Sequence, residues 1–365
     1  MRVNGLRSLL VAALVALFAC FGLNSFAQEK TPAPATEKKN AFDANEVIFG
    51  HIGDAHQFHF FSFKTSDGVE HHAIIPLPVI LYSPQKGFSV FMSSRFHHGE
   101  SVVDGYTLTE KGKVVPVDPN VKVYDISLTR NVVQMFIALT LLIIIMTSIA
   151  GKYKSGQGVT SAPKGIQSLV EPVITFVRDE VAKPNLGSRY EKYLPYLLTV
   201  FFFILINNLV GLIPGTANVT GNIAFTMVLA VISFIVILIS TNKHYWGHIF
   251  NPPVPVGVKP ILILVEFLGV FTKPFALMIR LFANMLAGHI IIICLVSLIF
   301  IFGALSSVIG WGFSPVSVAF VIFIYFIEIL VAFLQAYIFA NLTAVFIGQA
   351  FEGSHHEEHG DVAVL

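Results

Sequence analysis

Five long apolar runs, separated by short polar segments, dominate the chain from residue 131 onward. They cover about residues 131–150, 193–213, 223–240, 274–302 and 315–350. Because a helix needs about 20 apolar residues to cross a bilayer, the pattern predicts an all-α polytopic membrane protein with five transmembrane helices. The last two runs begin near Pro274 and Pro315 and are roughly 29 and 36 residues long. We therefore expect a long, tilted C-terminal helix hairpin, turned at residues 304–314.

The segment before the first run predicts a small N-terminal extramembrane module of β character, from about Val47 to Tyr124. Apolar and polar residues alternate over residues 56–63, and turn signals occur at Ser66-Asp67-Gly68 and Asp104-Gly105. Seven of the thirteen histidines lie here: His51, His56, His59, His71, His72, His97 and His98. Their spacing is not diagnostic of a metal site, so solvated strand faces are the favoured interpretation.

The first 27 residues have the features of a secretory signal peptide. Arg2 and Arg7 precede an apolar stretch that ends in a small-x-small cleavage site at Ser25-Phe26-Ala27. An uncleaved signal anchor and a lipid-modified Cys20 are the alternatives. A polar, proline-containing linker occupies residues 28–45. The predicted organisation is thus a signal peptide (1–27), a linker and periplasmic module (28–124), a membrane domain (125–350) and a cytoplasmic tail (351–365).

Basic residues beside the apolar runs predict the orientation of the chain. Lys152 and Lys154 follow the first run, and the second is preceded by further basic residues: Lys164, Arg178, Lys183, Arg189 and Lys192. Positive charge marks cytoplasmic loops, so residues 151–192 are expected inside the cell. We therefore expect a protein of the bacterial inner membrane. Its five crossings place the N-terminus on the periplasmic side and the C-terminus on the cytoplasmic side.

Composition agrees with a membrane environment. The chain is 55% hydrophobic and 12% charged, with a net charge of +1. Residues 193–350 contain only six acidic or basic side chains, too few for a surface that faces water. The six are Lys243, Lys259, Glu266, Lys273, Arg280 and Glu328. No basic patch with interleaved aromatic residues predicts a nucleic-acid partner, and no motif predicts a cofactor.

Arg280 is the most informative residue, because it lies inside the fourth apolar run. An arginine at the centre of a bilayer costs roughly 3 to more than 10 kcal/mol, and its guanidinium stays protonated. A snorkelling arginine near a helix end is the plain alternative. It is disfavoured because apolar residues extend far beyond Arg280 and because Lys273 already occupies the nearer interface. Intramembrane charges of this kind usually serve a function.

An antiparallel hairpin would bring the polar residues of the last two runs to two depths. His289 would lie level with Glu328, and Arg280 level with Gln335. At 1.5 Å per residue, the two levels are about 10 to 14 Å apart. His289 points about 180° away from Arg280 on the same helix, so the two serve different compartments or partners.

Two stripes of small residues accompany these polar groups. Ala276, Ala283 and Ala287 share a helix face with Arg280, and a second stripe of Ala332, Ala336 and Ala340 lies on the last helix. Small stripes allow another helix to come close. Tight packing inside this chain is the simple explanation. For the first stripe, Arg280 favours an acidic partner outside the chain.

Four motifs occur in order along the apolar part of the chain: residues 207–214 (NNLVGLIP), 220–226 (TGNIAFT), 280–289 (RLFANMLAGH) and 334–339 (LQAYIF). Together they resemble subunit a of the F-type ATP synthase, the stator of its membrane sector. The resemblance covers about residues 125–350. The pattern implies Arg280 as the essential arginine, Asn284 as its polar neighbour and Gln335 facing it. His289 and Glu328 correspond to a histidine and acid pair that the family also shows in the reverse arrangement. The module at 28–124 departs from the short N-terminus common in the family.

The resemblance implies a non-catalytic, proton-conducting subunit with two offset half-channels. Its partners would be a ring of c subunits, the b subunit stalk and the rest of the ATP synthase. Protons would enter past His289 and Glu328 and neutralise a ring carboxylate. Arg280 would hold the ionised carboxylate between the two paths and block a direct leak.

Two other classes of membrane protein require features that this sequence lacks. A secondary ion transporter should show an internal repeat with paired broken helices, and the Arg280 segment has no second copy. A haem-bearing enzyme needs histidines that face each other across helices, and His289 is the only histidine within a predicted span. Both alternatives therefore have less support than the stator.

Overall fold

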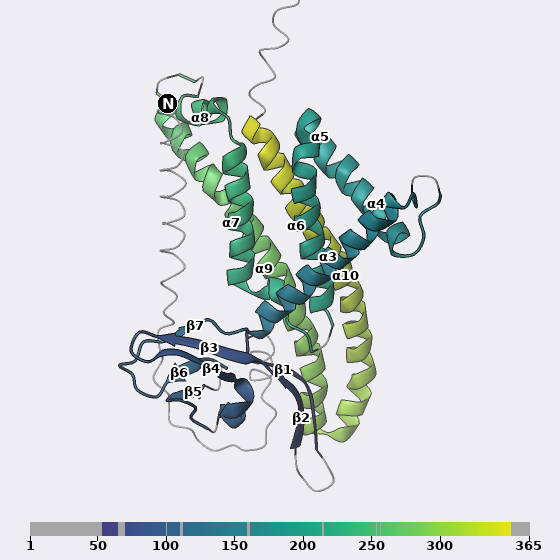
Figure 1. The fold of residues 1–365 in the computed structure, drawn as a ribbon. Coiled ribbons are helices and arrows are strands. Elements are labelled where there is room, and N and C mark those ends of the chain that lie inside the picture. Colours follow the sequence, from purple (N-terminus) through teal and green to yellow (C-terminus); the bar gives the residue numbers. More distant parts are fainter. Residues whose placement is uncertain are drawn as a thin grey trace, which may run out of the picture. The chain divides into compact units, whose positions relative to one another are not determined.

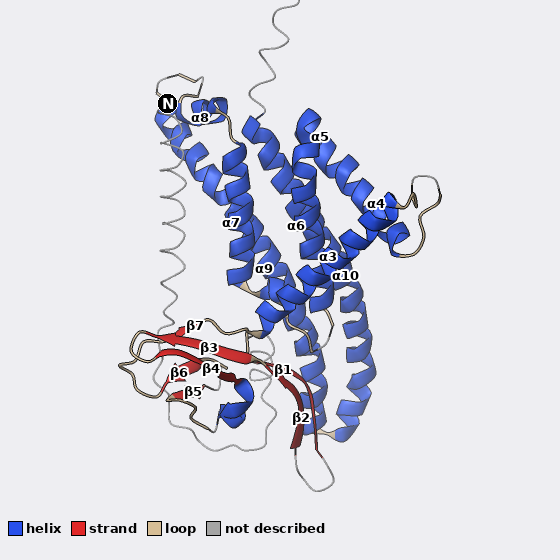
Figure 2. Cartoon of the chain, viewed as in Figure 1, coloured by secondary structure: helices blue, strands red, loops and turns tan. Residues whose placement is uncertain are grey.

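The computed structural model describes residues 53–351, except for 65–69, 100, 110–111, 159–160, 214, 253 and 256 (Figure 1). These residues belong to one compact unit, Asp43–Leu365. The predicted signal peptide, the linker and the tail beyond Phe351 lie outside the described residues. Figure 2 shows the chain as a helical part and a smaller part with strands, so the predicted fold class is confirmed.

Five helices in the described residues are long and apolar enough to cross a membrane, as the sequence predicts. They are α3 (Arg130–Lys154), α6 (Tyr190–Gly211), α7 (Ile223–Ser240), α9 (Lys259–Leu305) and α10 (Ser307–Phe351). A 3-10 turn, η4 (Val219–Gly221), precedes α7, and a short helix, α8 (Lys243–Phe250), follows it. The bounds of α3, α6 and α7 agree with prediction to within a few residues.

The predicted starts of the last two helices are wrong. Helix α9 begins at Lys259 rather than near Pro274, and α10 begins at Ser307 rather than near Pro315. Pro260 suits the first turn of a helix, where a proline loses no hydrogen bond. Pro274 and Pro315 lie inside their helices, which membrane helices tolerate when neighbours satisfy the freed backbone groups. The predicted turn at 304–314 shrinks to Ser306 alone.

Residues 151–192, predicted as a loop, are largely helical. They form α4 (Ile166–Phe176), a π-helical segment η2 (Val177–Ala182), α5 (Lys183–Leu186) and a 3-10 turn η3 (Gly187–Arg189). The short α5 reaches the end of α10, because Asn185 Nδ2 donates to Asn341 Oδ1 at 2.9 Å. A Cβ atom at Gly348 would overlap the backbone carbonyl of Asn185. Glycine thus permits the close approach of these two elements.

The main apolar core lies among the helices around α6. It combines side chains of α3, α4, η2, α5, α6, α7, α9 and α10. Leu197, Phe201 and Ile204 of α6 have no exposed surface, whereas much of α3 is exposed and apolar. An apolar exterior is expected where lipid or another subunit replaces water.

The N-terminal module consists of short antiparallel strands. A hairpin pairs β1 (Gln57–Lys64) with β2 (Glu70–Pro76). A three-stranded sheet has the order β4-β3-β7, and a second hairpin pairs β5 (Tyr106–Leu108) with β6 (Val114–Pro116). The strands of the sheet are β3 (Pro78–Ser83), β4 (Gly87–Met92) and β7 (Tyr124–Asp125), and a 3-10 helix, η1 (Ser93–Gly99), follows β4. The predicted turn at Asp104-Gly105 is present, with positive φ at both residues.

The module holds the first turn of α3. Ala55 O accepts from the backbone amide of Arg130 at 2.8 Å, and Asp54 Oδ1 accepts from that of Asn131 at 3.2 Å. The Arg130 guanidinium also donates to Gly53 O at 2.6 Å. Thr129 makes no side-chain cap, so Asp54 supplies the missing N-terminal acceptor from a distant part of the chain. The module is therefore bonded to α3 in addition to the covalent connection at residues 121–128.

His56 lies next to the junction, by which we mean the hydrogen bonds that join residues 53–55 to the first turn of α3. Its Nε2 lies 2.9 Å from Asp125 Oδ2 and its Nδ1 lies 3.0 Å from Gly112 O. Both partners can only accept, so both ring nitrogens donate and the imidazole is charged in this arrangement. Burial of the ring works against its charged form, but the Asp125 and Gly112 hydrogen bonds outweigh it and raise the pKa of His56. His56 thus has a structural partner, unlike the solvated histidine predicted for this strand.

Candidate functional site

The polar residues of the hairpin meet at two levels, as the antiparallel register predicts. Gln335 Nε2 of α10 donates to Arg280 O of α9 at 3.3 Å, which places these two residues side by side. Farther along the hairpin, Ser317 Oγ donates to Leu295 O. The Gln335 contact is to the Arg280 backbone, so it leaves the guanidinium available for other partners.

Glu328 packs directly against α9 at the second level. A Cβ atom at Gly288 would overlap the Glu328 carboxylate, so only glycine admits this side chain. Glu328 is 6% exposed, and the neighbouring His289 is half-buried. The structure thus brings Glu328 to the level of His289, and the Glu328 carboxylate lies beside Gly288.

Arg280 and Asn284 lie on the outer surface of α9. Both are exposed, and no ion pair joins Arg280 to a carboxylate among the described residues. Along the backbone of α9, Arg280 is about one helical turn from Asn284 and about 13 Å from His289. In an apolar surrounding, an unpaired arginine is costly, so this surface calls for a negative partner.

The two alanine stripes have opposite roles. Ala276, Ala283 and Ala287, which flank Arg280, are exposed. For this stripe, the reading of tight packing inside the chain is wrong, and the surface is free to receive another helix. The second stripe is buried inside the chain: Ala332, Ala336 and Ala340 have no exposed surface.

Two asparagines fix the long helices, and the residue-based prediction assigned them no role. Asn208 Nδ2 of α6 donates to Ala332 O of α10 at 3.2 Å. Asn218 Nδ2, before η4, donates to Met285 O of α9 at 3.0 Å. Both residues satisfy carbonyls beside the polar levels. An asparagine in an otherwise apolar segment is the sequence signal that could have identified them. A buried amide side chain needs hydrogen-bond partners.

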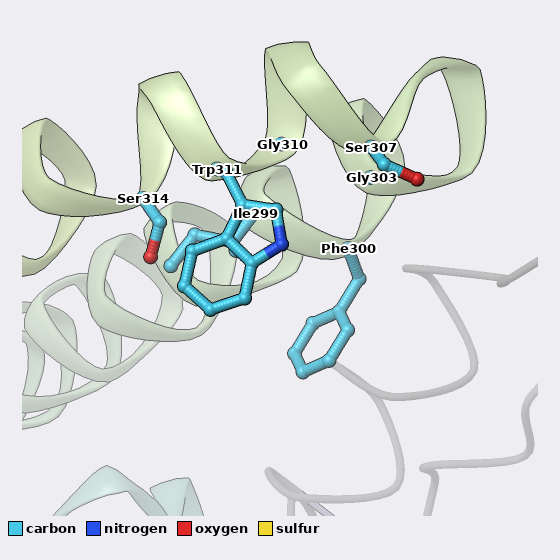
Figure 3. A pocket seen from close by; sticks show the side chains of 7 residues that line it. All are labelled: Ile299, Phe300, Gly303, Ser307, Gly310, Trp311 and Ser314. Carbon is cyan, nitrogen blue, oxygen red and sulfur yellow. The ribbon is translucent and has the colours of Figure 1, made fainter.

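A separate pocket of about 390 Å³ lies at the α9–α10 turn (Figure 3). Figure 3 shows Trp311 from α10 and Phe300 from α9 extending to the same side of the two helices. Ser314 is the lining residue of α10 nearest to Glu328 in the sequence. Glu328 is 14 positions further along the helix, which corresponds to about 21 Å. The pocket is therefore not part of the two polar levels.

The described residues contain no group of three or more metal-ligating side chains. Among the seven histidines of the module, only His56 has a described side chain, and it pairs with Asp125. The polar side chains of α9 and α10 lie instead at two depths of the hairpin.

A family model described as ATP synthase A chain matches residues 132–348, which include both polar levels. The chain belongs to this family. A second model, a domain of unknown function (DUF8433), matches residues 47–134 and hence the strand-containing module. The membrane helices and the module are thus matched separately.

Curated relatives agree. The chain is 47% identical to ATP synthase subunit a of Chloroherpeton thalassium over 73% of this chain and 78% of the relative. It is 39% identical to ATP synthase subunit a 2 of Prosthecochloris aestuarii over 98% of both. ATP synthase subunit a of Myxococcus xanthus is 40% identical over 69% of this chain and 82% of the relative. With its five apolar helices, the chain is a multi-pass bacterial membrane protein of the ATP synthase.

Proposed function

We propose that the chain is the proton-conducting stator subunit of a rotary F-type ATP synthase. The observation that carries the proposal is the position of Arg280. It lies exposed among alanines on the outer face of a long apolar helix, and no carboxylate of the described chain pairs with it. Such a surface suits a second helix that carries a membrane carboxylate, which is the chemistry of a ring of c subunits.

Arg280 would separate two half-channels. A ring carboxylate that reaches Arg280 is stabilised as its anion, so it releases its proton into the inner path. The permanent charge of Arg280 also repels a proton that would pass directly between the paths. Lysine is a poorer choice for this role, because burial lowers the pKa of an ammonium until it can release a proton.

His289 and Glu328 would form the inlet from the outer side. They lie at one level, about 10 to 14 Å along the helix axis from the level of Arg280 and Gln335. A proton that passes them would neutralise a ring carboxylate, and the neutral ring site can then face lipid at low cost. Asn284 would lie on the ring-facing surface beside Arg280.

The energy available suits such a coupling. One charge that crosses 100 mV gains about 2.3 kcal/mol, so each ATP requires several protons. A leak past Arg280 would dissipate that gradient. The subunit itself would carry out no catalysis, and its further partners would be the b subunit stalk and the rest of the synthase.

The orientation follows from the basic residues. Lys152, Lys154 and Lys164 would lie in the cytoplasm, together with the C-terminus, and the module would lie in the periplasm of the bacterial inner membrane. This orientation places the level of His289 and Glu328 nearer the periplasm than that of Arg280.

An exchange of the inlet residues tests the proposal. We expect the double variant His289→Glu, Glu328→His to retain more ATP-driven proton pumping than either single variant. Each single change leaves two acids or two bases beside each other, whereas the double change restores one of each. The measurement is acidification of inverted vesicles that contain equal amounts of assembled synthase. A double variant no better than the product of the two singles would contradict the pairing.

A further inference from the structure

The sheet β4-β3-β7 of the module is apolar on both faces. One face packs Val79, Leu81 and Phe91 into the module core. The other face is exposed and carries Tyr82, Phe88, Val90, Met92 and Tyr124. Tyr82 of β3 lies directly opposite Phe88 of β4 on one side and Tyr124 of β7 on the other. The exposed fractions of Phe88 and Val90 are 71% and 66%, so this face is open in the described chain.

This face does not have the composition of a surface made for water. Strands β3 and β4 contain no charged residue. The charge of Asp125 in β7 is directed to His56 instead. Stacked and tilted rings gather on the face, with centroids 6.4 Å apart for Tyr82 and Tyr124 and 4.8 Å apart for Tyr82 and Phe88. A contiguous exposed apolar patch of this kind marks an interaction surface.

The patch continues toward the first membrane helix. Ile126 donates its backbone N–H to Ile80 O at 2.9 Å and is 59% exposed. Arg130, the first residue of α3, is only four positions after Ile126. Extended chain spans at most about 3.3–3.6 Å per residue, so Ile126 lies within about 14 Å of the helix start. The edge of the patch is therefore held near the depth at which α3 enters the bilayer.

We propose that this face docks on the outer leaflet of the bilayer. Phe, Val, Met and Ile side chains would enter the acyl boundary, and the hydroxyls of Tyr82 and Tyr124 would remain among the headgroups. Tyrosine is typical of this interfacial zone because its ring is apolar and its tip is polar. The hydrogen bonds of Gly53, Asp54 and Ala55 to the first turn of α3 support the docking, because they restrict the module at the same end of the helix.

A lipid surface is favoured over a protein partner by the position of the face. Rings and aliphatic groups with few charges also form the centres of protein interfaces, so the location of the face decides between the two. The face is continuous with the start of a membrane-spanning helix, which brings it near lipid without a further component. A protein that covers the face is the outcome that would overturn the proposal.

Fluorescence quenching by labelled lipids tests this docking. A polarity-sensitive dye is attached to Val90→Cys in the full-length chain, with Cys20→Ser and Cys294→Ser to remove other thiols. The chain is studied in vesicles of phosphatidylethanolamine and phosphatidylglycerol, with and without nitroxide-bearing acyl chains. Lys113→Cys, which lies exposed on the separate β5–β6 hairpin, is the matched control.

We expect blue-shifted emission at position 90, and severalfold stronger quenching by the nitroxide lipids than at position 113. Aqueous iodide should show the opposite order. Equal quenching at the two positions by iodide, with little by lipid, would overturn the proposal. A blue shift at position 90 that occurs only in the complete synthase and is insensitive to nitroxide lipids would also overturn it, in favour of a protein partner. Met92→Cys repeats the test should Val90→Cys disturb the strand.

Discussion

At the residue scale, Gly288 determines where the Glu328 carboxylate can lie. A methyl group at this position would overlap the carboxylate, and the atom in the way is the end of a flexible side chain. The three nearest heavy atoms all belong to the Glu328 side chain rather than to backbone. A substitution should therefore move Glu328 while leaving the fold of the hairpin in place.

We expect Gly288→Ala to reduce ATP-driven proton pumping severalfold without loss of assembled synthase. The displaced carboxylate no longer lies at the level of His289, so the proposed inlet is impaired. Gly303→Ala is the control on the same helix, because a Cβ atom there meets nothing within 4 Å. Pumping by Gly288→Ala at the level of the control, per assembled complex, would show that the position of Glu328 is unimportant.

The His56 and Asp125 pair predicts a pH dependence of the module junction. The pKa of His56 is raised, so its stabilisation is complete below the unfolded value of about 6.5 and is lost as pH rises through the folded value. Burial works against the Asp125 anion, but hydrogen bonds from His56 and Ser127 outweigh it and lower the pKa of Asp125. Its stabilisation is present above about pH 4 and is lost as pH falls through the folded value. The junction should be most stable between about pH 4 and 6.5.

Hydrogen-exchange protection of the amides of Leu77 and Arg130 measures this effect, because they donate to the backbone of His56 and Ala55. We expect protection to fall as the pH rises above about 6.5 in the native chain, and to vary much less in His56→Gln. The same fall in His56→Gln would assign the pH dependence to another group.

At the element scale, apolar run length identified the five crossings, but local proline signals misplaced the hairpin. The prediction takes Pro274 and Pro315 as helix starts, whereas both lie within helices. Basic residues predict a cytoplasmic loop over residues 151–192, whereas residues 166–189 of this segment are helical. Its helices depend on contacts with α6 and α10 that lie far away in the sequence, such as Asn185 with Asn341.

We expect Gly348→Ala to destabilise the contact of α5 with α10. The obstacle is the backbone carbonyl of Asn185, which cannot rotate away as a side chain can. Overpacking of this kind costs about 1–3 kcal/mol. Thermal unfolding of the purified chain in detergent should show a lower Tm than for Gly151→Ala, whose Cβ atom meets nothing within 4 Å. Equal Tm values for the two variants would contradict the close approach.

At the scale of the whole molecule, sequence alone predicted the class of fold, the β character of the module and the two polar levels. Periodicity and charge suffice for these, because a bilayer permits few structures and few buried charges. Sequence could not predict the junction, in which Asp54 and Ala55 bond to the first turn of α3. Nor could it predict that Ala332, Ala336 and Ala340 face inward, although Arg280 favours an outward face for Ala276, Ala283 and Ala287. Those distinctions depend on tertiary packing.

The central claim is that Arg280 is the charge that couples proton passage to rotation. ATP-driven acidification of inverted vesicles that carry Arg280→Ala in an otherwise native, fully assembled synthase tests it most directly, with Lys273→Ala as a control for loss of a cation on the same helix. We expect Arg280→Ala to abolish coupled pumping, since nothing then holds the ring carboxylate between the two paths, and Lys273→Ala to retain most of it. Substantial ATP-driven pumping in the Arg280→Ala vesicles would contradict the account.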